Sequence, residues 1–163
     1  MSRSDVHFGS PCAITSDESR FMAAMGQLIG GVPVAADSIA TLPLSTGAYA
    51  ILLRLDEKVV FSSRSGSDSF GPGWYVYAGR AYGPGGLRAR IARHLKRSKT
   101  LRWHIDHLTS VAATAQAIAV EGGNECAIVG TLIGSGLFVC TANGFGASDC
   151  TTCPSHLLRP AAG

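Results

Sequence analysis

The chain has 163 residues, of which 46% are hydrophobic, and its formal net charge at pH 7 is only +3. A chain of this length and composition can bury one ordinary hydrophobic core, and its charge balance excludes a protein that is polycationic throughout. Because no apolar run reaches the length of a membrane span, no secretory signal is recognisable and the number of cysteines is odd, we expect a cytoplasmic protein with reduced thiols.

The sequence divides into an N-terminal extension of residues 1–44, a domain of residues 45–159 and a tail of residues 160–163. The extension starts with a polar segment of little periodicity, which we expect to be partly disordered. Within residues 18–29, apolar side chains recur at helical spacing and precede two glycines. This pattern predicts a short amphipathic helix that docks on the domain or covers a hydrophobic patch. Its apolar residues are Phe21, Met25, Leu28 and Ile29.

Three segments at the start of the domain have the composition of β-strands. Apolar residues alternate along residues 47–55, and residues 58–62 are expected to form the hairpin partner of that strand, with a turn near Asp56. Residues 63–73 are rich in serine and glycine and predict a loop, after which residues 74–78 predict a third strand. The domain is therefore expected to begin as a small sheet.

Helical spacing appears after a glycine-rich turn over residues 79–86. The next helix is expected to have an apolar stripe beside a basic flank, and the stripe consists of Leu87, Ile91 and Leu95. A second short helix is predicted over residues 101–108, a strand over residues 114–120, and a helix over residues 124–132 whose first residue, an asparagine, is a suitable N-cap. These elements predict an α+β domain with a small antiparallel or mixed sheet flanked by helices.

Basic residues are concentrated between Trp74 and Leu108, a segment that holds eight of the fourteen lysines and arginines. No acidic residue occurs between Asp68 and Asp106, so the local sequence leaves this charge unbalanced. Clustered lysine and arginine offset phosphate repulsion and release counterions, and the interleaved aromatic residues favour a nucleic-acid site. A solvated basic helix is the alternative. The candidate nucleic-acid contacts are Arg80, Arg88, Arg93, Lys96, Arg97, Lys99 and Arg102.

Two tripeptides resemble the paired motifs of the GIY-YIG nuclease superfamily: Gly47-Ala48-Tyr49 on the first strand and Tyr77-Ala78-Gly79 on a later one. Arg90 and His94 follow at the spacing that the superfamily's helix requires, and Glu125 opens the later helix. The order of these residues, together with several later segments, makes the resemblance specific. Those further segments are residues 72–77, 83–87, 102–106, 125–126, 144–150 and 155–157.

The resemblance covers residues 46–158 and is closest to a compact prokaryotic branch of uncharacterised domains, some of which are fused to endonuclease-III-type DNA glycosylases. It implies a GIY-YIG-like fold and a DNA-binding endonuclease that hydrolyses a phosphodiester with one Mg²⁺ or Mn²⁺ ion. It also implies DNA as the partner, with branched or damaged DNA among the candidates, and a functional link to a DNA glycosylase in DNA repair.

The same resemblance implies a role for each candidate catalytic residue. Glu125 would bind the metal, Arg90 would neutralise the phosphate, and Tyr49 would take or relay a proton. Tyr77 would position the phosphate or the water, and His94 would act as an acid, a base or a phosphate ligand. From the residues alone, the tyrosines are half-buried strand aromatics, the arginine is solvated, the histidine is a structural hydrogen-bonder and the glutamate is stabilised by the helix dipole.

The chain departs from the superfamily pattern in two ways. The span between Tyr49 and Tyr77 is longer than the hairpin that joins the motifs in well-studied members. Residues 56–73 are therefore expected to form an insertion, with an extra strand and loop near the site. Alanine replaces isoleucine in both tripeptides, at Ala48 and Ala78, which we expect to alter packing alone.

Cys150, Cys153 and His156 have the donor types and the close spacing of a zinc half-site. A closed site needs a fourth ligand, which Cys126 or Cys140 would have to supply from elsewhere in the fold. Since only one close pair of cysteines is present, the sequence favours reduced cysteines packed in a folded tail over structural zinc. Two other functions stay open beside the nuclease: a nucleic-acid-binding module that does not cut, and a small metal-binding interaction domain.

Overall fold

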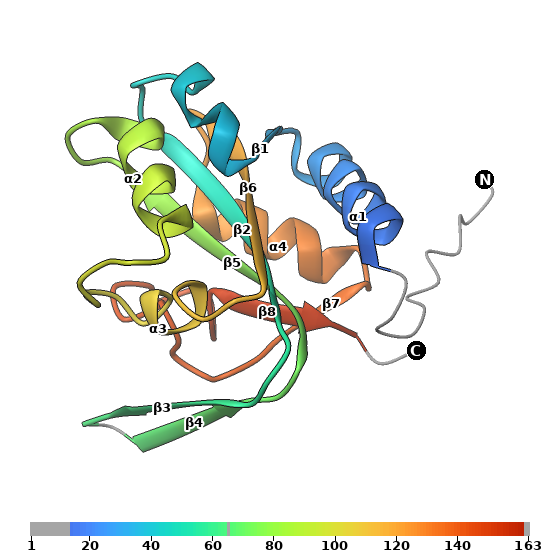
Figure 1. The fold of residues 1–163 in the computed structure, drawn as a ribbon, viewed down its shortest axis with the longest axis vertical. Helices are drawn as coiled ribbons and strands as arrows, with labels where there is room; N and C mark the ends of the chain where they lie inside the picture. The colour runs from blue at the N-terminus through green and yellow to red at the C-terminus, as the bar shows by residue number, and fades with distance from the viewer. Residues whose placement is uncertain (1–13, 65, 162–163) are drawn as a thin grey trace.

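The computed structural model describes residues 14–64 and 66–161, and these residues form the α+β architecture that the sequence predicts. A six-stranded antiparallel sheet lies between two layers of helices, and a separate two-stranded hairpin extends from one end of it (Figure 1). In chain order the elements are α1 (Ile14–Ile29), β1 (Val32–Val34), the 3-10 helix η1 (Ala36–Thr41), β2 (Gly47–Leu55), β3 (Val59–Ser63), β4 (Gly66–Phe70), β5 (Gly73–Ala81), α2 (Gly86–Leu95), α3 (Asp106–Thr109), β6 (Thr114–Glu121), α4 (Glu125–Gly134), β7 (Phe138–Cys140) and β8 (Leu157–Pro160).

Strand β2 lies inside the sheet, whose strand order is β1-β6-β2-β5-β8-β7. It pairs with β5 on one edge and with β6 on the other, so that Tyr49 lies between Gly79 and Ala119. All nine of its residues except Arg54 are buried. Helices cover both faces of the sheet, which explains why apolar residues occupy consecutive positions of this strand and not only alternate ones.

The two faces of the sheet carry side chains of different size. On one face, Tyr49 and Leu53 of β2 belong to the same core cluster as Ile91 of α2. The opposite face presents the small side chains of Ala48 and Ala78, which belong to a second cluster with residues of α1 and α4. The alanines of the two tripeptides therefore let α4 pack close to the sheet.

The N-terminal extension shares the core of the domain. Helix α1 contains the helix expected over residues 18–29, and it buries Phe21 and Met25 in the α4-side cluster. Strand β1 pairs with β6 and forms an edge of the sheet. Residues 1–13, which include Cys12 and the polar start that we expect to be disordered, lie outside the described residues.

The hairpin within residues 56–73 differs from the expected pairing. Strand β3 pairs with β4, whereas the sequence predicts β2 as its partner. Both edges of β2 are occupied by the long strands β5 and β6, so the serine- and glycine-rich segment expected to be a loop supplies the partner instead. The insertion does lie near the site described below, because Phe61 of β3 packs against His104 and Phe145.

Two more segments differ from their predictions. Helix α3 is only four residues long, because the carboxylate of Asp106 accepts hydrogen bonds from the backbone N–H groups of Arg102 and Trp103 and holds a turn before it. Strands β7 and β8, which the sequence pattern does not predict, extend the sheet beyond β5. In the described part of the chain, no helix combines the length and apolar character that crossing a membrane requires.

Candidate functional site

A cleft of about 480 Å³ is lined by residues from β2, β5, α2, the start of α4 and the loop between β7 and β8. The antiparallel pairing of β2 with β5 places the two motif tyrosines at this end of the sheet, and α2 packs over them. Side chains to which the resemblance assigns catalytic roles therefore meet in one cleft. All five candidate catalytic residues line the cleft: Tyr49, Tyr77, Arg90, His94 and Glu125.

Glycines make room for both tyrosines. Gly79 lies opposite Tyr49 in the sheet, and a Cβ atom at Gly79 would collide with the phenol ring. Gly146 has a left-handed φ of 64°, and a Cβ atom there would lie 2.6 Å from Cε2 of Tyr77. The glycine that ends the second tripeptide thus accommodates the tyrosine that ends the first.

Tyr49, His94 and Asp106 form a chain of polar side chains that runs from the cleft into the protein. The Tyr49 hydroxyl lies 2.7 Å from Nε2 of His94, and Nδ1 of His94 lies 3.6 Å from Oδ1 of Asp106. Burial lowers the pKa of His94 below its ordinary value, although Asp106 opposes this shift. Burial raises the pKa of Tyr49 well above its ordinary value and that of Tyr77 to about 12. At neutral pH both tyrosines are therefore protonated and the imidazole is neutral.

Asp106 is a site residue that the sequence did not reveal. Its side chain is fully buried, and its carboxylate accepts hydrogen bonds from Nη1 and Nη2 of Arg93 at 3.0 and 2.9 Å. Burial alone would raise the pKa of Asp106, but His94, the backbone N–H groups and Arg93 outweigh burial and hold this pKa below its ordinary value. Two signals in the sequence point to it: Asp106 is the first acidic residue after a long basic segment, and it ends one of the segments that carry the family resemblance.

Arg90 reaches the cleft from α2 and rests on an aromatic ring. Its guanidinium lies 4.4 Å from the centroid of the Trp103 indole, a distance typical of cation–π contact. Among the residues that the structure describes, its side chain has no hydrogen-bond or ion-pair partner. The charge of Arg90 is therefore available to an anion in the cleft.

Glu125 is the first residue of α4, directly after the N-cap Asn124, whose side chain accepts from the backbone N–H groups of Cys126 and Ala127. Its side chain is buried, and Oε1 lies 3.5 Å from Nη1 of Arg80. Within the described residues, the buried Oε2 atom has no hydrogen-bond partner. An unpartnered carboxylate oxygen at the wall of a cleft fits the requirements of a hard divalent cation.

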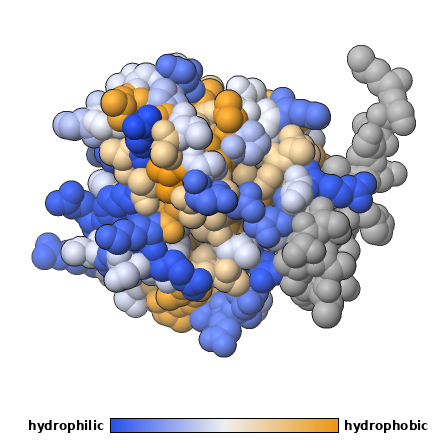
Figure 2. Space-filling model, turned by 45° about the horizontal axis from the view of Figure 1, so that its top comes forward, coloured by the Kyte–Doolittle hydropathy of each residue, from blue (hydrophilic) through white to orange (hydrophobic). Residues whose placement is uncertain are grey.

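The candidate nucleic-acid contacts fall into two groups. Arg80 and Arg102 line the cleft, and Lys96 and Arg97 are exposed just beyond the end of α2. Hydrophilic residues gather at the left of Figure 2, the side of the molecule on which Figure 1 draws α2 and the β3–β4 hairpin. These four side chains remain candidates for phosphate contacts.

The other three candidates have partners inside the protein. Arg93 binds Asp106, and Nε of Arg88 donates to the carbonyl of Leu42 at 2.8 Å. The Lys99 ammonium donates to the carbonyl of His94 at 2.7 Å and to Oγ1 of Thr109 at 2.6 Å, and burial lowers the pKa of Lys99 to about 8. Because Asp106 and backbone carbonyls satisfy these groups, we do not assign Arg88, Arg93 and Lys99 to a nucleic-acid surface.

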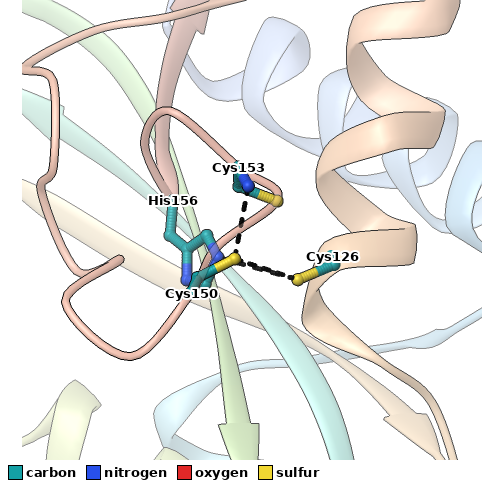
Figure 3. A group of neighbouring side chains, drawn as sticks. All are labelled: Cys126, Cys150, Cys153 and His156. Carbon is teal, nitrogen blue, oxygen red and sulfur yellow. Dashed lines mark hydrogen bonds between the residues drawn. The ribbon is translucent and has the colours of Figure 1, made fainter.

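A second group of side chains lies at the same end of the domain. The donor atoms of Cys126, Cys150, Cys153 and His156 all lie within 4.8 Å of one another (Figure 3). Cys126 is thus the cysteine that completes the group, whereas Cys140 lies apart, with its Sγ 3.5 Å from the carbonyl oxygen of Ser155. The group could hold a metal ion, and three thiols with one imidazole suit Zn²⁺ better than Mg²⁺.

One family of known sequences matches the chain. The family described as "Domain of unknown function DUF123" matches residues 48–162, which is well over half of the chain. The matched segment includes the five candidate catalytic residues and the Cys126 group, and it leaves out α1 and β1. No curated protein and no solved structure matches the chain.

Proposed function

We propose, starting from the finding that the chain belongs to the DUF123 family, that its cleft is the active site of a GIY-YIG-like endonuclease that hydrolyses a DNA phosphodiester. The observation that carries the proposal is the 2.7 Å contact between Tyr49 and His94 in the same cleft as Arg90 and Glu125. Phosphodiester hydrolysis needs an activated water, neutralisation of phosphate charge and help for the leaving oxygen. The cleft offers groups for the first two of these requirements.

Tyr49 and His94 together would activate the water. The raised pKa of Tyr49 means that the phenol does not ionise by itself at neutral pH. Its hydroxyl can instead donate to the neutral Nε2 of His94 while the hydroxyl oxygen accepts a proton from the water. The opposite ring nitrogen faces Asp106, whose negative charge would stabilise the imidazolium that results. The direction of proton transfer is thus from water through Tyr49 to His94.

Arg90 would neutralise the phosphate. Its guanidinium carries a permanent charge and a fork of donors that matches two phosphate oxygens. Stacking on Trp103 holds the guanidinium in the cleft without using its N–H groups. Arg90 therefore combines a fixed position with free donors, which supports a role in binding the transition state.

Glu125 would hold one Mg²⁺ or Mn²⁺ ion through its unpartnered Oε2. An ion bound there supplies Lewis-acid stabilisation to the phosphate oxygens. Arg80, which lies between Glu125 and the exposed Asp149, would share the carboxylate charge with the ion or move toward the phosphate. The expected readout is a cleavage activity that depends on the metal and on Glu125.

The ion pair between Arg80 and Glu125 favours one alternative. If Arg80 satisfies this carboxylate permanently, no metal binds and the cleft becomes a nucleic-acid-binding site that does not cut. The basic side chains at the cleft and beyond α2 would serve binding in either case. DNA remains the proposed partner, and the link to a DNA glycosylase and to repair rests on the family resemblance.

The deciding experiment incubates the purified chain with labelled nicked, branched and single-stranded DNA, in Mg²⁺, in Mn²⁺ and in EDTA. We expect cleavage in the presence of metal and none in EDTA. The Glu125→Ala variant, purified in parallel, controls for a contaminating nuclease and should lose both the activity and its metal dependence. Binding without cleavage of any substrate in either metal would overturn the nuclease and favour the binding module.

A further inference from the structure

Four sulfur and nitrogen donors converge from two separate parts of the fold. Cys126 lies in the first turn of α4, and Cys150, Cys153 and His156 lie on the loop that precedes β8. Figure 3 shows the Cys126 sulfur directed from the helix toward the sulfur of Cys150 on the loop. The contact therefore joins a helix to a loop across the wall of the cleft, which Cys150 and His156 also line.

The spacing of these donors matches a tetrahedral metal site. In such a site the Zn–S bonds are about 2.3 Å long, so two sulfur ligands lie about 3.8 Å apart. Sγ of Cys126 lies 3.5 Å from Sγ of Cys150 and 4.0 Å from Nε2 of His156. Both separations are within about 0.5 Å of those in a tetrahedral zinc site, and all four donor atoms lie within 4.8 Å of one another. All four described cysteines are free, so no disulfide competes for the group.

Hydrogen-bond donors of the loop contact two of the sulfur atoms. The backbone N–H of Cys153 donates to Sγ of Cys150 at 3.3 Å, and the hydroxyl of Thr152 lies 3.6 Å from Sγ of Cys126. The sheet holds the end of the loop, because the N–H of Ala78 on β5 donates to the carbonyl of His156 at 2.9 Å. The His156 donor is thus presented by backbone that the sheet anchors.

We infer that Cys126, Cys150, Cys153 and His156 bind one zinc ion in a closed, structural site that ties the start of α4 to the loop before β8. Four protein ligands leave no open position for substrate, which separates this site from the divalent ion proposed at Glu125. The donor set consists of soft sulfur and imidazole, which selects Zn²⁺ over Mg²⁺ and Ca²⁺.

The zinc would also position the cleft carboxylates. Glu125 directly precedes the ligand Cys126, and Asp149 directly precedes the ligand Cys150. The two carboxylates lie 3.5 and 3.6 Å from the guanidinium of Arg80. Each acid is therefore one residue from a zinc ligand, so a zinc ion bound to both ligands would fix the distance between the two carboxylates. Without zinc, we expect the loop that carries Asp149 to separate from α4.

The test measures bound metal in the full chain, without DNA and without added Mg²⁺. Elemental analysis of the protein purified without chelators should find about one zinc ion per chain. The Cys126→Ser variant should lose most of this zinc on dialysis, and the Cys140→Ser variant should keep it. Cys140 is a matched control because it is a half-buried free cysteine outside the group.

A second measurement does not depend on the folding of a variant. The wild-type chain, stripped of metal and titrated with Co²⁺, should develop the visible absorption of tetrahedral cobalt and the near-ultraviolet bands of cobalt bound to thiolates. Zinc retained fully by Cys126→Ser, Co²⁺ bound without thiolate bands, or a Cys126–Cys150 disulfide in the purified chain would each overturn the inference. Since none of these readouts uses DNA, they test the zinc proposal separately from the nuclease proposal.

Discussion

Two groups of basic residues at the end of α2 carry the same charge and occupy opposite environments. Arg93 and Lys99 lie around the buried carboxylate of Asp106. Lys96 and Arg97 lie between them in the sequence, are exposed, and have no side-chain partner among the residues described. A single buried acid thus divides one basic segment into internal and external halves. Charge density along a sequence therefore overestimates the surface that a partner can contact.

The two groups should differ in what their charges do. The Asp106 group, which we define as Asp106, Arg93, Lys99 and His94, contributes to folding and to the orientation of the imidazole beside Tyr49. The exposed pair, Lys96 and Arg97, acts through solvent, where salt largely screens its interactions with charges more than about 8 Å away at physiological ionic strength. Substitutions in the first group should change stability and rate, and substitutions in the second should change salt dependence.

The largest effect is expected from Asp106→Asn, which removes the buried charge that Arg93 and Lys99 share. We expect the free energy of unfolding to fall by about 3–5 kcal/mol, because breaking a buried ion pair leaves its partners uncompensated. Denaturant unfolding measures this change. The control is Asp56→Asn, since Asp56 is exposed and pairs with Arg54 at 3.1 Å. If the two variants are equally stable at neutral pH, Asp106 contributes no more to stability than an exposed acid, and the contrast between the two groups is wrong.

Acid should erase the difference between wild type and Asp106→Asn. The folded-state pKa of Asp106 lies below its ordinary value of 3.8. Its ionised form therefore contributes stability above that value, and the contribution is lost as the pH falls through the folded-state pKa. The gap between the two unfolding free energies should persist down to about pH 4 and shrink below it. A gap that closes already near neutral pH would contradict the assigned role.

Arg90→Ala should lower the single-turnover cleavage rate on the order of 10² or more, by analogy with the loss of one preorganised donor from a transition-state site. Arg97→Ala removes the same charge from a neighbouring exposed position and should leave this rate nearly unchanged at saturating enzyme. Rates measured for both variants on one DNA substrate decide the point. If the two variants lose the same factor, charge alone and not position in the cleft supports the reaction.

The pH profile should report the Asp106 group directly. In the proposed mechanism cleavage requires neutral His94, and burial lowers the pKa of His94 below its ordinary value of 6.5. Activity should therefore be retained at pH 6.5 and fall about tenfold per pH unit only in more acidic solution. Tyr49→Phe keeps the ring but breaks the relay, so its residual activity should lack this acidic limb. An unchanged acidic limb in Tyr49→Phe would remove Tyr49 from the proton path.

The smallest effect concerns the exposed pair. Replacing both Lys96 and Arg97 by alanine should flatten the dependence of log affinity on log salt by about two units, or about one for each lost phosphate contact. The matched control replaces Arg20 of α1 and Lys58, which are also exposed, and changes the net charge equally. If the control variant reduces the salt slope more than the Lys96 and Arg97 variant does, the nucleic-acid surface lies on another side of the domain.

Local patterns predicted the elements that pack through their own side chains. The alternation along β2, the apolar stripe of α2 and the N-cap Asn124 of α4 each follow from a few neighbouring residues. The two tripeptides placed Tyr49 and Tyr77 correctly at one cleft because antiparallel pairing of their strands brings them together. These features depend on short-range rules, so the sequence alone was sufficient.

The features that the sequence missed depend on contacts between distant segments. Strand β3 lost its expected partner because β6, far along the chain, occupies the second edge of β2. The cations around Asp106 were predicted to be external because nothing local shows that this carboxylate is buried. Cys126 could not be separated from Cys140 as the fourth donor, since only the docking of α4 brings one of them to the loop. In each case tertiary packing decided between alternatives that local chemistry leaves equal.

The close fit of Gly79 against Tyr49 links the side chains that positions 79 and 49 can accept. Gly79 lies in regular strand backbone, so the demand for glycine comes from the neighbouring ring and not from its own torsion angles. A methyl group at position 79 becomes tolerable only when the side chain at position 49 becomes smaller. We therefore expect substitutions in either tripeptide to be constrained by the residue that the other tripeptide carries. Chains in this family that have lost tyrosine at the first motif should be those in which the second motif is free to lose its glycine.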